Sequence, residues 1–167
     1  MIDLIVRFDQ WFILLIHRNA FLKRLDPIVY LISILGSSMF TFPFTMLCMY
    51  LNLRLGMELF SSLALCFFAV QFCKYKIQRW RPYHGMMGIE AYGKREIESS
   101  FPSGHSSAVV AMSVCLNPYL HLPFLLILAA AIVGYTRIHL GHHYPSDVVG
   151  GMIVGAILST FVVFLLS

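Results

Sequence analysis

The chain is poor in charge. Only 12% of its 167 residues are Asp, Glu, Lys or Arg, whereas 59% are hydrophobic, and a soluble domain usually carries about 25% charged residues. This composition excludes a disordered chain, a coiled coil and a collagen-like repeat. A soluble globule of this length has too much surface for so much apolar area to be hidden. The sequence therefore predicts an all-α integral membrane protein with several spanning helices.

The sequence also lacks any C-x-x-C pair, so zinc-ribbon and thioredoxin chemistry have no support. Its four cysteines each fall within or at the end of an apolar run, and we expect free, buried thiols at Cys48, Cys66, Cys73 and Cys115. The net charge of +4 does not indicate a nucleic-acid partner, because the basic residues form no basic helix. They suit lipid headgroups or a phosphorylated ligand better. No segment points to an obligate protein partner.

The N-terminus carries no signal-peptide pattern, since Asp3 and Asp9 are acidic and no small-residue cleavage site follows the apolar stretch. Four polar side chains recur there at helical spacing and form a stripe: Asp3, Arg7, Gln10 and His17. This pattern favours a helix in the membrane interface over a short span packed on other helices. We expect residues 1–24 to form this interfacial or short helix and residues 25–167 the core bundle, within one membrane-embedded domain, 1–167.

Apolar runs divide the rest of the chain into five predicted spans, since about 20 helical residues cross a bilayer. The spans are 26–54, 55–74, 103–117, 121–138 and 146–166. Gly36 and Pro43 are positions where the first can bend, and Asn117-Pro118 breaks the longest uncharged run. The expected fold class is a polytopic transmembrane helical bundle of five spans plus an N-terminal amphipathic helix, or six spans if that helix also crosses.

One long polar segment, residues 75–102, separates the second span from the third. A loop of this length in a compact protein is usually functional or disordered. Because each span reverses the side of the membrane, this segment and residues 139–145 reach the same membrane face. Three clusters of polar residues therefore meet on that face.

The first two clusters suit an anion. Lys74 and Arg81, with six residues between them, are basic side chains at the end of a span, where simple anchoring is common. In the second cluster, Ser103 is a natural N-cap and Gly104 lets a ligand approach the backbone closely. A helix that begins there presents unpaired N–H groups to an anion, with His105 in its first turn.

The third cluster contains Thr136, Arg137, His143 and Asp147. A turn at Pro145 would let His143 meet Asp147, and a carboxylate that accepts from one imidazole nitrogen leaves the other nucleophilic. Arg137 supplies a planar fork for phosphate oxygens. Taken together, the clusters offer charge neutralisation, a nucleophile and a proton donor, which is the set that phosphoryl transfer needs.

These residues resemble the signature of a known family. K-x6-R-P, P-S-G-H and S-R-x5-H-x3-D mark the type 2 phosphatidic acid phosphatases, the lipid phosphate phosphatases related to vanadium haloperoxidases. This sequence has KYKIQRWRP, PSGH and TRIHLGHHYPSD, so the resemblance runs from Lys74 to Asp147. The one departure is Thr136, where the family usually has Ser, and the hydroxyl is kept. The absence of long terminal extensions suggests a minimal bacterial form.

The resemblance implies a role for each matching residue. His143 would attack phosphorus and become a phosphohistidine, Asp147 would orient it, and His105 would protonate the leaving oxygen and later activate water. The phosphate oxygens would be held by five residues: Lys74, Arg81, Ser103, Gly104 and Arg137. The resemblance implies neither a metal nor another cofactor.

It also implies a lipid substrate and a membrane. The expected reaction is hydrolysis of a lipid phosphomonoester or pyrophosphate, with undecaprenyl pyrophosphate or phosphatidylglycerol phosphate as substrate and lipid A 1-phosphate or phosphatidic acid as alternatives. The expected location is a bacterial inner (cytoplasmic) membrane. The resemblance favours an outer-face site, whereas the positive-inside rule would place the basic residues in the cytoplasm. Several of these cations have a catalytic reason to be where they are, so we favour the outer face.

Three other interpretations stay open on sequence alone. His139, His142, His143 and Asp147 have side chains that bind zinc or iron, although a metal site leaves the PSGH motif and the cations unexplained. A non-enzymatic membrane scaffold or lipid carrier would give the clusters structural roles. A haloperoxidase would bind vanadate in the same kind of pocket, but the apolar spans argue against this soluble class.

Overall fold

The computed structural model describes residues 2–167, and these residues form helices and loops without a strand. Met1, which belongs to the expected N-terminal helix, lies outside the described residues. The elements in chain order are α1 (Ile2–His17), α2 (Ala20–Lys23), α3 (Asp26–Ser33), the 3-10 turn η1 (Ile34–Gly36), α4 (Ser38–Leu51), α5 (Leu53–Ile77), α6 (Pro82–Gly85), α7 (Gly104–Leu120), α8 (Pro123–His139) and α9 (Pro145–Leu166). The all-α prediction is confirmed.

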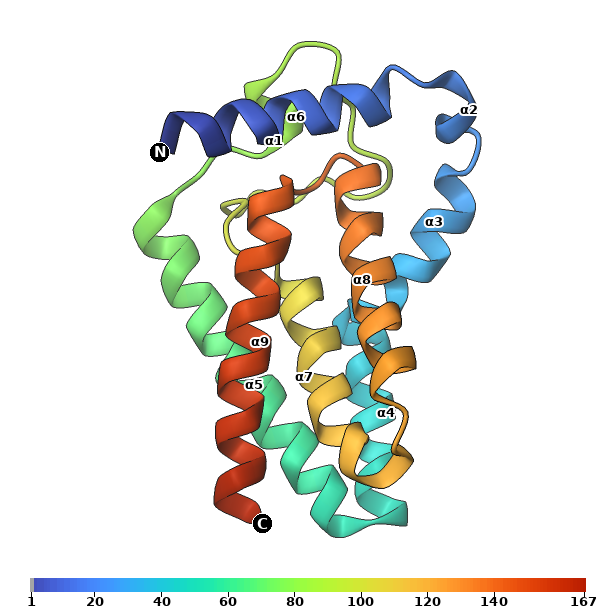
Figure 1. Cartoon of the computed structure of the whole chain (residues 1–167), viewed down its shortest axis with the longest axis vertical. Helices are drawn as coiled ribbons and strands as arrows, with labels where there is room; N and C mark the ends of the chain where they lie inside the picture. The colour runs from blue at the N-terminus through green and yellow to red at the C-terminus, as the bar shows by residue number, and fades with distance from the viewer. Residues whose placement is uncertain (1) are drawn as a thin grey trace.

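The long helices form a bundle that α1 covers at one end. Helices α4, α5, α7, α8 and α9 run along the length of the molecule, and α7 packs against α5, α8 and α9. Helix α1 lies across their ends, beside the segment between α5 and α7 and the turn between α8 and α9 (Figure 1). We call this end, made by α1, residues 78–103 and residues 140–144, the loop end. The C-terminus lies at the opposite end (Figure 1).

The first predicted span is broken rather than continuous. Its two parts, Asp26–Gly36 and Ser38–Leu51, meet at an angle of 44°. Gly36, one of the two expected bending positions, lies at the break, and a Cβ there would come within 2.9 Å of the carbonyl oxygen of His105. Glycine therefore lets the bend pack closely on the first turn of α7. Pro43 lies inside α4, which continues through it.

The predicted end of the third span is wrong by a few residues. Helix α7 continues through Asn117 and Pro118 to Leu120 and ends where His121 takes a left-handed conformation, with φ of 53°. A proline within the last turn removes one hydrogen bond but leaves the preceding turns intact.

Length and composition identify candidate membrane spans among the described residues. In the described residues, the stretch Leu53–Gly85 and helix α9 are long and apolar enough to cross a membrane, and the bent pair α3–α4 makes a third candidate. Helices α7 and α8 have 17 residues each, fewer than the roughly 20 that a straight crossing needs. The structure thus supports two or three of the five expected spans.

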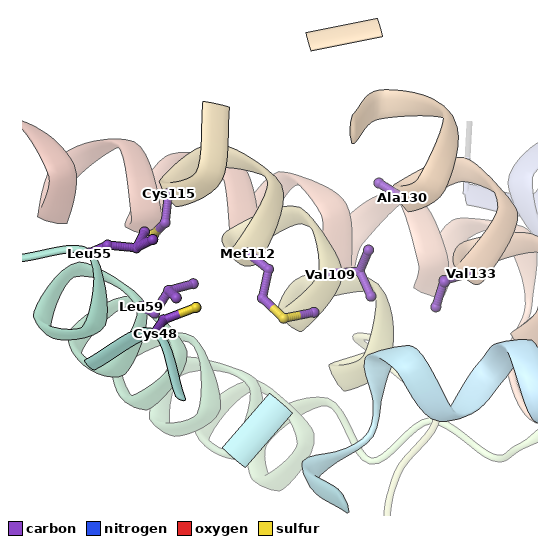
Figure 2. Packing of buried hydrophobic residues seen from close by; sticks show 8 residues of the cluster. All are labelled: Cys48, Leu55, Leu59, Val109, Met112, Cys115, Ala130 and Val133. Carbon is purple, nitrogen blue, oxygen red and sulfur yellow. The ribbon is translucent and has the colours of Figure 1, made fainter. Parts of the chain in front are cut away.

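Apolar packing fills the middle of the bundle. One buried cluster joins α4, α5, α7 and α8, and Figure 2 shows its eight side chains: Cys48, Leu55, Leu59, Val109, Met112, Cys115, Ala130 and Val133. All four cysteines are free, as expected, with Cys73 half-buried and the other three buried. Cys73 is thus less buried than expected, and the three buried thiols act as small apolar side chains.

Helix α9 packs on α7 through glycines. A Cβ on Gly151 would lie 2.3 Å from the carbonyl oxygen of Ser103, and one on Gly155 would lie 2.5 Å from that of Ser107. Neither position therefore tolerates a side chain, and the backbones approach closely. A hydrogen bond of 2.9 Å from the backbone N–H of Ser103 to the carbonyl oxygen of Asp147 holds the first turn of α9 against the start of α7.

Helix α1 presents different faces to the bundle and to its surroundings. Asp9, Ile13 and Ile16, which recur at helical spacing, are buried against the bundle. Phe8 and Trp11 lie on the outer side and are more than half exposed. An exposed apolar face on a helix that lies across the bundle end suits the interface of a membrane.

Candidate active site

The loop end brings the three sequence clusters together. Arg81 Nη1 lies 3.4 Å from His143 Nε2, although the two residues are far apart in the sequence. Glu96 contacts both Arg81 and Arg137, which lie on different segments. Lys74, Gly104 and His105 line one cavity together with Glu96. The predicted phosphate-binding and histidine residues therefore converge on one site.

His143 is buried and held in one orientation. Its Nδ1 lies 2.7 Å from the carbonyl oxygen of Ser100. Since a carbonyl can only accept, Nδ1 carries the proton and Nε2 keeps its lone pair. Burial, followed by the positive charges of Arg81 and Arg137, holds the pKa of His143 well below its usual value. The side chain is thus a neutral imidazole whose free nitrogen faces Arg81.

The expected hydrogen bond from His143 to Asp147 is absent, and this prediction is wrong in the described structure. The nearest approach, from His143 Nδ1 to Asp147 Oδ2, is 3.8 Å. Asp147 Oδ2 instead accepts from Ser100 Oγ at 2.5 Å and from the backbone N–H of Tyr144 at 2.8 Å. The carboxylate of Asp147 caps α9, and Ser100 links it to the imidazole of His143.

Two of the predicted cations share one carboxylate. Glu96 binds Arg81 Nη2 at 2.5 Å and Arg137 Nη2 at 2.8 Å. Burial would raise the pKa of Glu96, but Arg137 and Arg81 together lower it to about 2. Arg137 also donates to Ser33, while its buried Nε has no partner. A buried guanidinium with an unused donor is suited to an anion.

Lys74, the third predicted cation, is also paired. Its Nζ lies 2.7 Å from Glu98, whose carboxylate is about half exposed. The hydrogen bond to Lys74 is the main cause that lowers the pKa of Glu98. The cations of the site are therefore held in place by carboxylates from one short segment, residues 96–98.

The start of α7 matches its prediction. Ser103 caps the helix by accepting from the backbone N–H and the hydroxyl of Ser106. A Cβ on Gly104 would meet only Val70, at 3.8 Å, so this turn is open towards the cavity. His105 follows in the first turn and lines the same cavity. An open helix start of this kind favours a bound anion.

The remaining histidines do not gather into a metal site. His139 Nε2 bonds to Asp26 at 2.9 Å, and His142 Nε2 donates to the carbonyl oxygen of Tyr92 at 2.9 Å. Within residues 2–167, no three His, Cys, Asp or Glu side chains lie close enough to hold a metal ion. His139 and His142 thus make structural hydrogen bonds to Asp26 and to the Tyr92 carbonyl oxygen.

Four further residues belong to the site but were not singled out from the sequence: Asp9, Arg79, Glu96 and Ser100. Arg79 lies only two positions before Arg81, and Ser100 lies just before the PSGH motif. Their closeness to these motifs could have indicated that they belong to the site. Asp9 offered a weaker one, as an acid in an otherwise apolar helix. Glu96 offered none, because its partners are distant in sequence.

Two neighbouring cavities are lined in part by residues of the site. One, of about 730 Å³, is lined by basic and aromatic side chains that include Arg79, Trp80 and Arg95. The other, of about 660 Å³, runs between α4, α5 and α7 and is lined by apolar residues such as Leu63, Phe67 and Val70 before it reaches His105. The segment 95–98 lines both. An apolar groove that ends at a charged site suits an amphiphile.

Comparison with known sequences is consistent with this geometry. A sequence model described as the PAP2 superfamily matches residues 55–166, a range that holds all three clusters. The chain is 35% identical over 119 residues to a lipid A 1-phosphatase of Rhizobium johnstonii, which covers 66% of this chain and 48% of the relative. It is 27% identical over 108 residues to an undecaprenyl-diphosphatase of Sulfolobus acidocaldarius, covering 64% and 52%. The chain spans about half the length of these relatives.

Two solved structures share the fold. The crystal structure of LpxE from Aquifex aeolicus superposes with a TM-score of 0.80 at 24% identity and covers 92% of this chain and 93% of that one. A transmembrane PAP2-type phosphatidylglycerolphosphate phosphatase from Bacillus subtilis gives a TM-score of 0.78 at 23% identity, with coverage of 94% and 83%. The arrangement of helices around the site is therefore one that membrane proteins of this type adopt.

Proposed function

Because this chain belongs to the PAP2 superfamily, we propose that it is a membrane phosphatase that hydrolyses the phosphate or pyrophosphate group of a lipid. One observation supports the proposal: the Nε2 of a neutral His143 lies beside Arg81, which shares Glu96 with Arg137. A lone-pair nitrogen next to fixed positive charge is what attack on phosphorus requires. The alternative of a scaffold or lipid carrier leaves this orientation without a purpose.

The first step forms a bond from His143 Nε2 to the terminal phosphorus and breaks the bond from that phosphorus to its leaving oxygen. The leaving oxygen is the lipid oxygen of a phosphomonoester or the bridging oxygen of a pyrophosphate, which stays on the lipid monophosphate. Arg81 and Arg137 neutralise the charge on the phosphoryl oxygens. His105, in protonated form, donates its proton to this leaving oxygen. General acid help of this kind is worth about 10²–10⁴ in rate.

The second step releases phosphate. Neutral His105 takes a proton from water, the water oxygen bonds to phosphorus, and the bond from phosphorus to His143 Nε2 breaks. Inorganic phosphate leaves, and both histidines return to their starting forms. The side chains that carry these steps all belong to this chain.

The substrate class follows from the groove and the relatives. The apolar groove beside His105 fits a lipid chain, and the charged end fits a phosphate. Relatives are named for lipid A 1-phosphate, undecaprenyl diphosphate and phosphatidylglycerophosphate. We favour undecaprenyl pyrophosphate or phosphatidylglycerol phosphate, with lipid A 1-phosphate and phosphatidic acid as further candidates.

The membrane arrangement is part of the proposal. Five spans, α3–α4, α5, α7, α8 and α9, would place the loop end on one membrane face, with α1 in the interface of that face. The single domain would lie in a bacterial inner membrane with the site on the outer face. A cysteine at Met87, which is 98% exposed at the loop end, would then react with an impermeant maleimide in intact cells. One at Leu122, at the opposite end, would react only after permeabilisation, and the reverse result would contradict the outer-face assignment.

The decisive experiment measures phosphate release from the four lipids by purified protein in detergent. His143→Ala should abolish release, and EDTA should not affect it. The matched control is His121→Asn, because His121 is exposed at the opposite end in a left-handed conformation that Asn tolerates. Release that survives His143→Ala, or no release from any of the lipids, would contradict the proposal.

A further inference from the structure

The N-terminal helix contributes a fully buried carboxylate to the loop end. Asp9 is 0% exposed, whereas Asp3, six residues earlier on α1, is exposed. Removing a charged group from water is costly unless the group is paired and hydrogen-bonded. A buried charge on a surface helix therefore indicates specific partners.

Asp9 has three such contacts. Its Oδ1 accepts from the backbone N–H of Ser146 at 3.0 Å. Its Oδ2 accepts from the hydroxyl of Ser146 at 2.5 Å and from Arg79 Nη2 at 2.7 Å. Ser146 lies in the first turn of α9, so a carboxylate from α1 caps a helix far away in the sequence. These bonds attach α1 to the same turn of α9 that carries Asp147.

Arg79 joins the two carboxylates. Its Nη2 contacts Asp9 and its Nη1 contacts Asp147 Oδ1 at 2.6 Å, while its guanidinium carbon lies 4.2 Å from the centre of the Tyr144 ring. Although burial opposes its charge, Asp147 and Asp9 raise the pKa of Arg79. The planar guanidinium group thus donates from one Nη atom to each carboxylate, which a lysine could not reproduce.

The chain of contacts continues to the nucleophile. The backbone carbonyl of Arg79 accepts from the N–H of Ser100 at 2.9 Å. Ser100 donates its hydroxyl to Asp147, and its carbonyl oxygen accepts from His143 Nδ1. Arg79 therefore orients both the carboxylate and the serine that fix the imidazole. None of these contacts involves a side chain that is expected to hold the phosphate.

We propose that Asp9 and Arg79 are positioning residues for the reaction, which together make correct orientation of His143 depend on the docked N-terminal helix. The inference rests on the proposed function. Asp9 fixes Arg79 and the start of α9, and Arg79 fixes Asp147 and Ser100. A small misplacement of a reacting group costs up to about 10²-fold in rate, so a defect in this network lowers kcat and leaves KM nearly unchanged.

Asp9 and Arg79 carry opposite charges, so replacing each should shift the pH profile of kcat in opposite directions. A simple loss of folded protein would not produce such shifts. His143 is faced by Lys74 from α5, by Arg81 and Glu96 from the segment 78–103, by His105 from α7, by Arg137 from α8 and by Asp147 from α9. Adding net positive charge nearby lowers the pH at which its imidazole becomes protonated, and adding net negative charge raises it. Asp9→Asn adds net positive charge and should lower this pH, whereas Arg79→Gln adds net negative charge and should raise it.

The experiment compares the pH profile of kcat for five forms of the full chain in detergent: wild type, Asp9→Asn, Arg79→Gln, Arg79→Lys and Asp3→Asn. We expect a 10- to 100-fold lower kcat for both Asp9→Asn and Arg79→Gln, with the acid limb moved to lower pH in the first and to higher pH in the second. Arg79→Lys should lower kcat without moving the limb, because the charge stays and the fork is lost. Asp3→Asn, on the exposed side of α1, should match wild type.

The possible outcomes distinguish the positioning role of Asp9 and Arg79 from the proposed function. Active wild type with an unchanged kcat in Asp9→Asn overturns the positioning role and leaves the proposed function standing. A lower kcat with the same pH profile in both variants shows a loss of folded protein and also overturns it. Wild type that releases no phosphate from any of the lipids overturns the proposed function, and the positioning role falls with it.

Discussion

The middle of the bundle and its loop end both bury side chains completely, but they stabilise them in different ways. Around Leu59 and Met112 the buried groups are mostly apolar and are stabilised mainly by close packing, with the buried Glu58 paired to Arg54. Around His143 the buried groups include Arg81, Arg137 and Asp147, each of which needs a hydrogen-bonding partner. The comparison suggests that mutations in the middle change stability, whereas mutations at the loop end change the chemistry.

The largest expected effect lies at the loop end. Arg137→Gln removes a buried guanidinium that binds Glu96 and carries an unused donor, and losing one such charge-stabilising donor typically costs about 10²–10³ in rate. Steady-state assays on a lipid phosphate should show this loss in kcat/KM. Arg54→Gln, at the other end, removes a half-exposed partner of Glu58 and should leave kcat/KM unchanged. Equal losses in both would contradict the division between the two regions.

Truncating a side chain in the middle of the bundle should lower stability and leave the catalytic rate unchanged. Leu59→Ala removes a fully buried side chain from the cluster in Figure 2, and such a change costs about 2–5 kcal/mol through the cavity that remains. Thermal unfolding in detergent should show a lower midpoint, while kcat per folded molecule stays at the wild-type value. A kcat that falls while the unfolding midpoint holds would show that the core shapes the site directly.

A smaller effect is expected at the loop end, where a buried histidine should make the stability depend on pH. Burial, with Arg137 nearby, lowers the pKa of His142 from 6.5 to about 4. Between these values the unfolded chain binds more protons than the native one, so stability rises with pH and is lost as pH falls from 6.5 towards 4. The change amounts to about 3 kcal/mol at most.

His142→Asn tests this linkage, because Asn keeps a donor for the Tyr92 carbonyl without a titrating group. Unfolding midpoints measured between pH 7 and pH 4 should show a flatter slope for His142→Asn than for wild type. The exposed His121→Asn should keep the wild-type slope. A slope unaffected by His142→Asn would assign the acid sensitivity to His143 and the other buried groups.

The smallest expected effect concerns the carboxylate that occupies the cation cluster. Glu96 competes with phosphate for Arg81 and Arg137, so Glu96→Gln should lower the inhibition constant of inorganic phosphate about 10-fold, the equivalent of roughly 1.4 kcal/mol. Competitive inhibition assays would measure it. Glu90→Gln is the matched control, because Glu90 is an exposed carboxylate of the same segment between α5 and α7. Weaker phosphate inhibition in Glu96→Gln would show that Glu96 helps to build the site instead of competing for it.

Local patterns predicted the elements well, for physical reasons that operate over a few residues. Apolar runs located the long helices, and Ser103 caps α7 as its residue type indicates. Gly36 lies at the bend of the first predicted span. The end of α7 was less accurate, because a proline in a last turn disturbs only local hydrogen bonds and His121 completes the cap.

Contacts between distant segments account for what was missed. Nothing near Glu96 in the sequence shows that it binds Arg81 and Arg137. Asp147 was expected to bind His143, and the spacing allowed it, but the carboxylate is occupied by Ser100, Tyr144 and Arg79. Competition among partners for one carboxylate is decided only when all of them are in place.

The sequence by itself determined an all-helical, strongly apolar chain and the residue types that converge on the loop end, because hydrophobic period and motif spacing are properties of short stretches. Only the tertiary structure decided which hydrogen bonds those residues make, that α1 lies across the bundle, and that Asp9 reaches Arg79. The physical reason is that a buried charge is stabilised by whichever partners the packed helices bring within reach, and these come from anywhere in the chain.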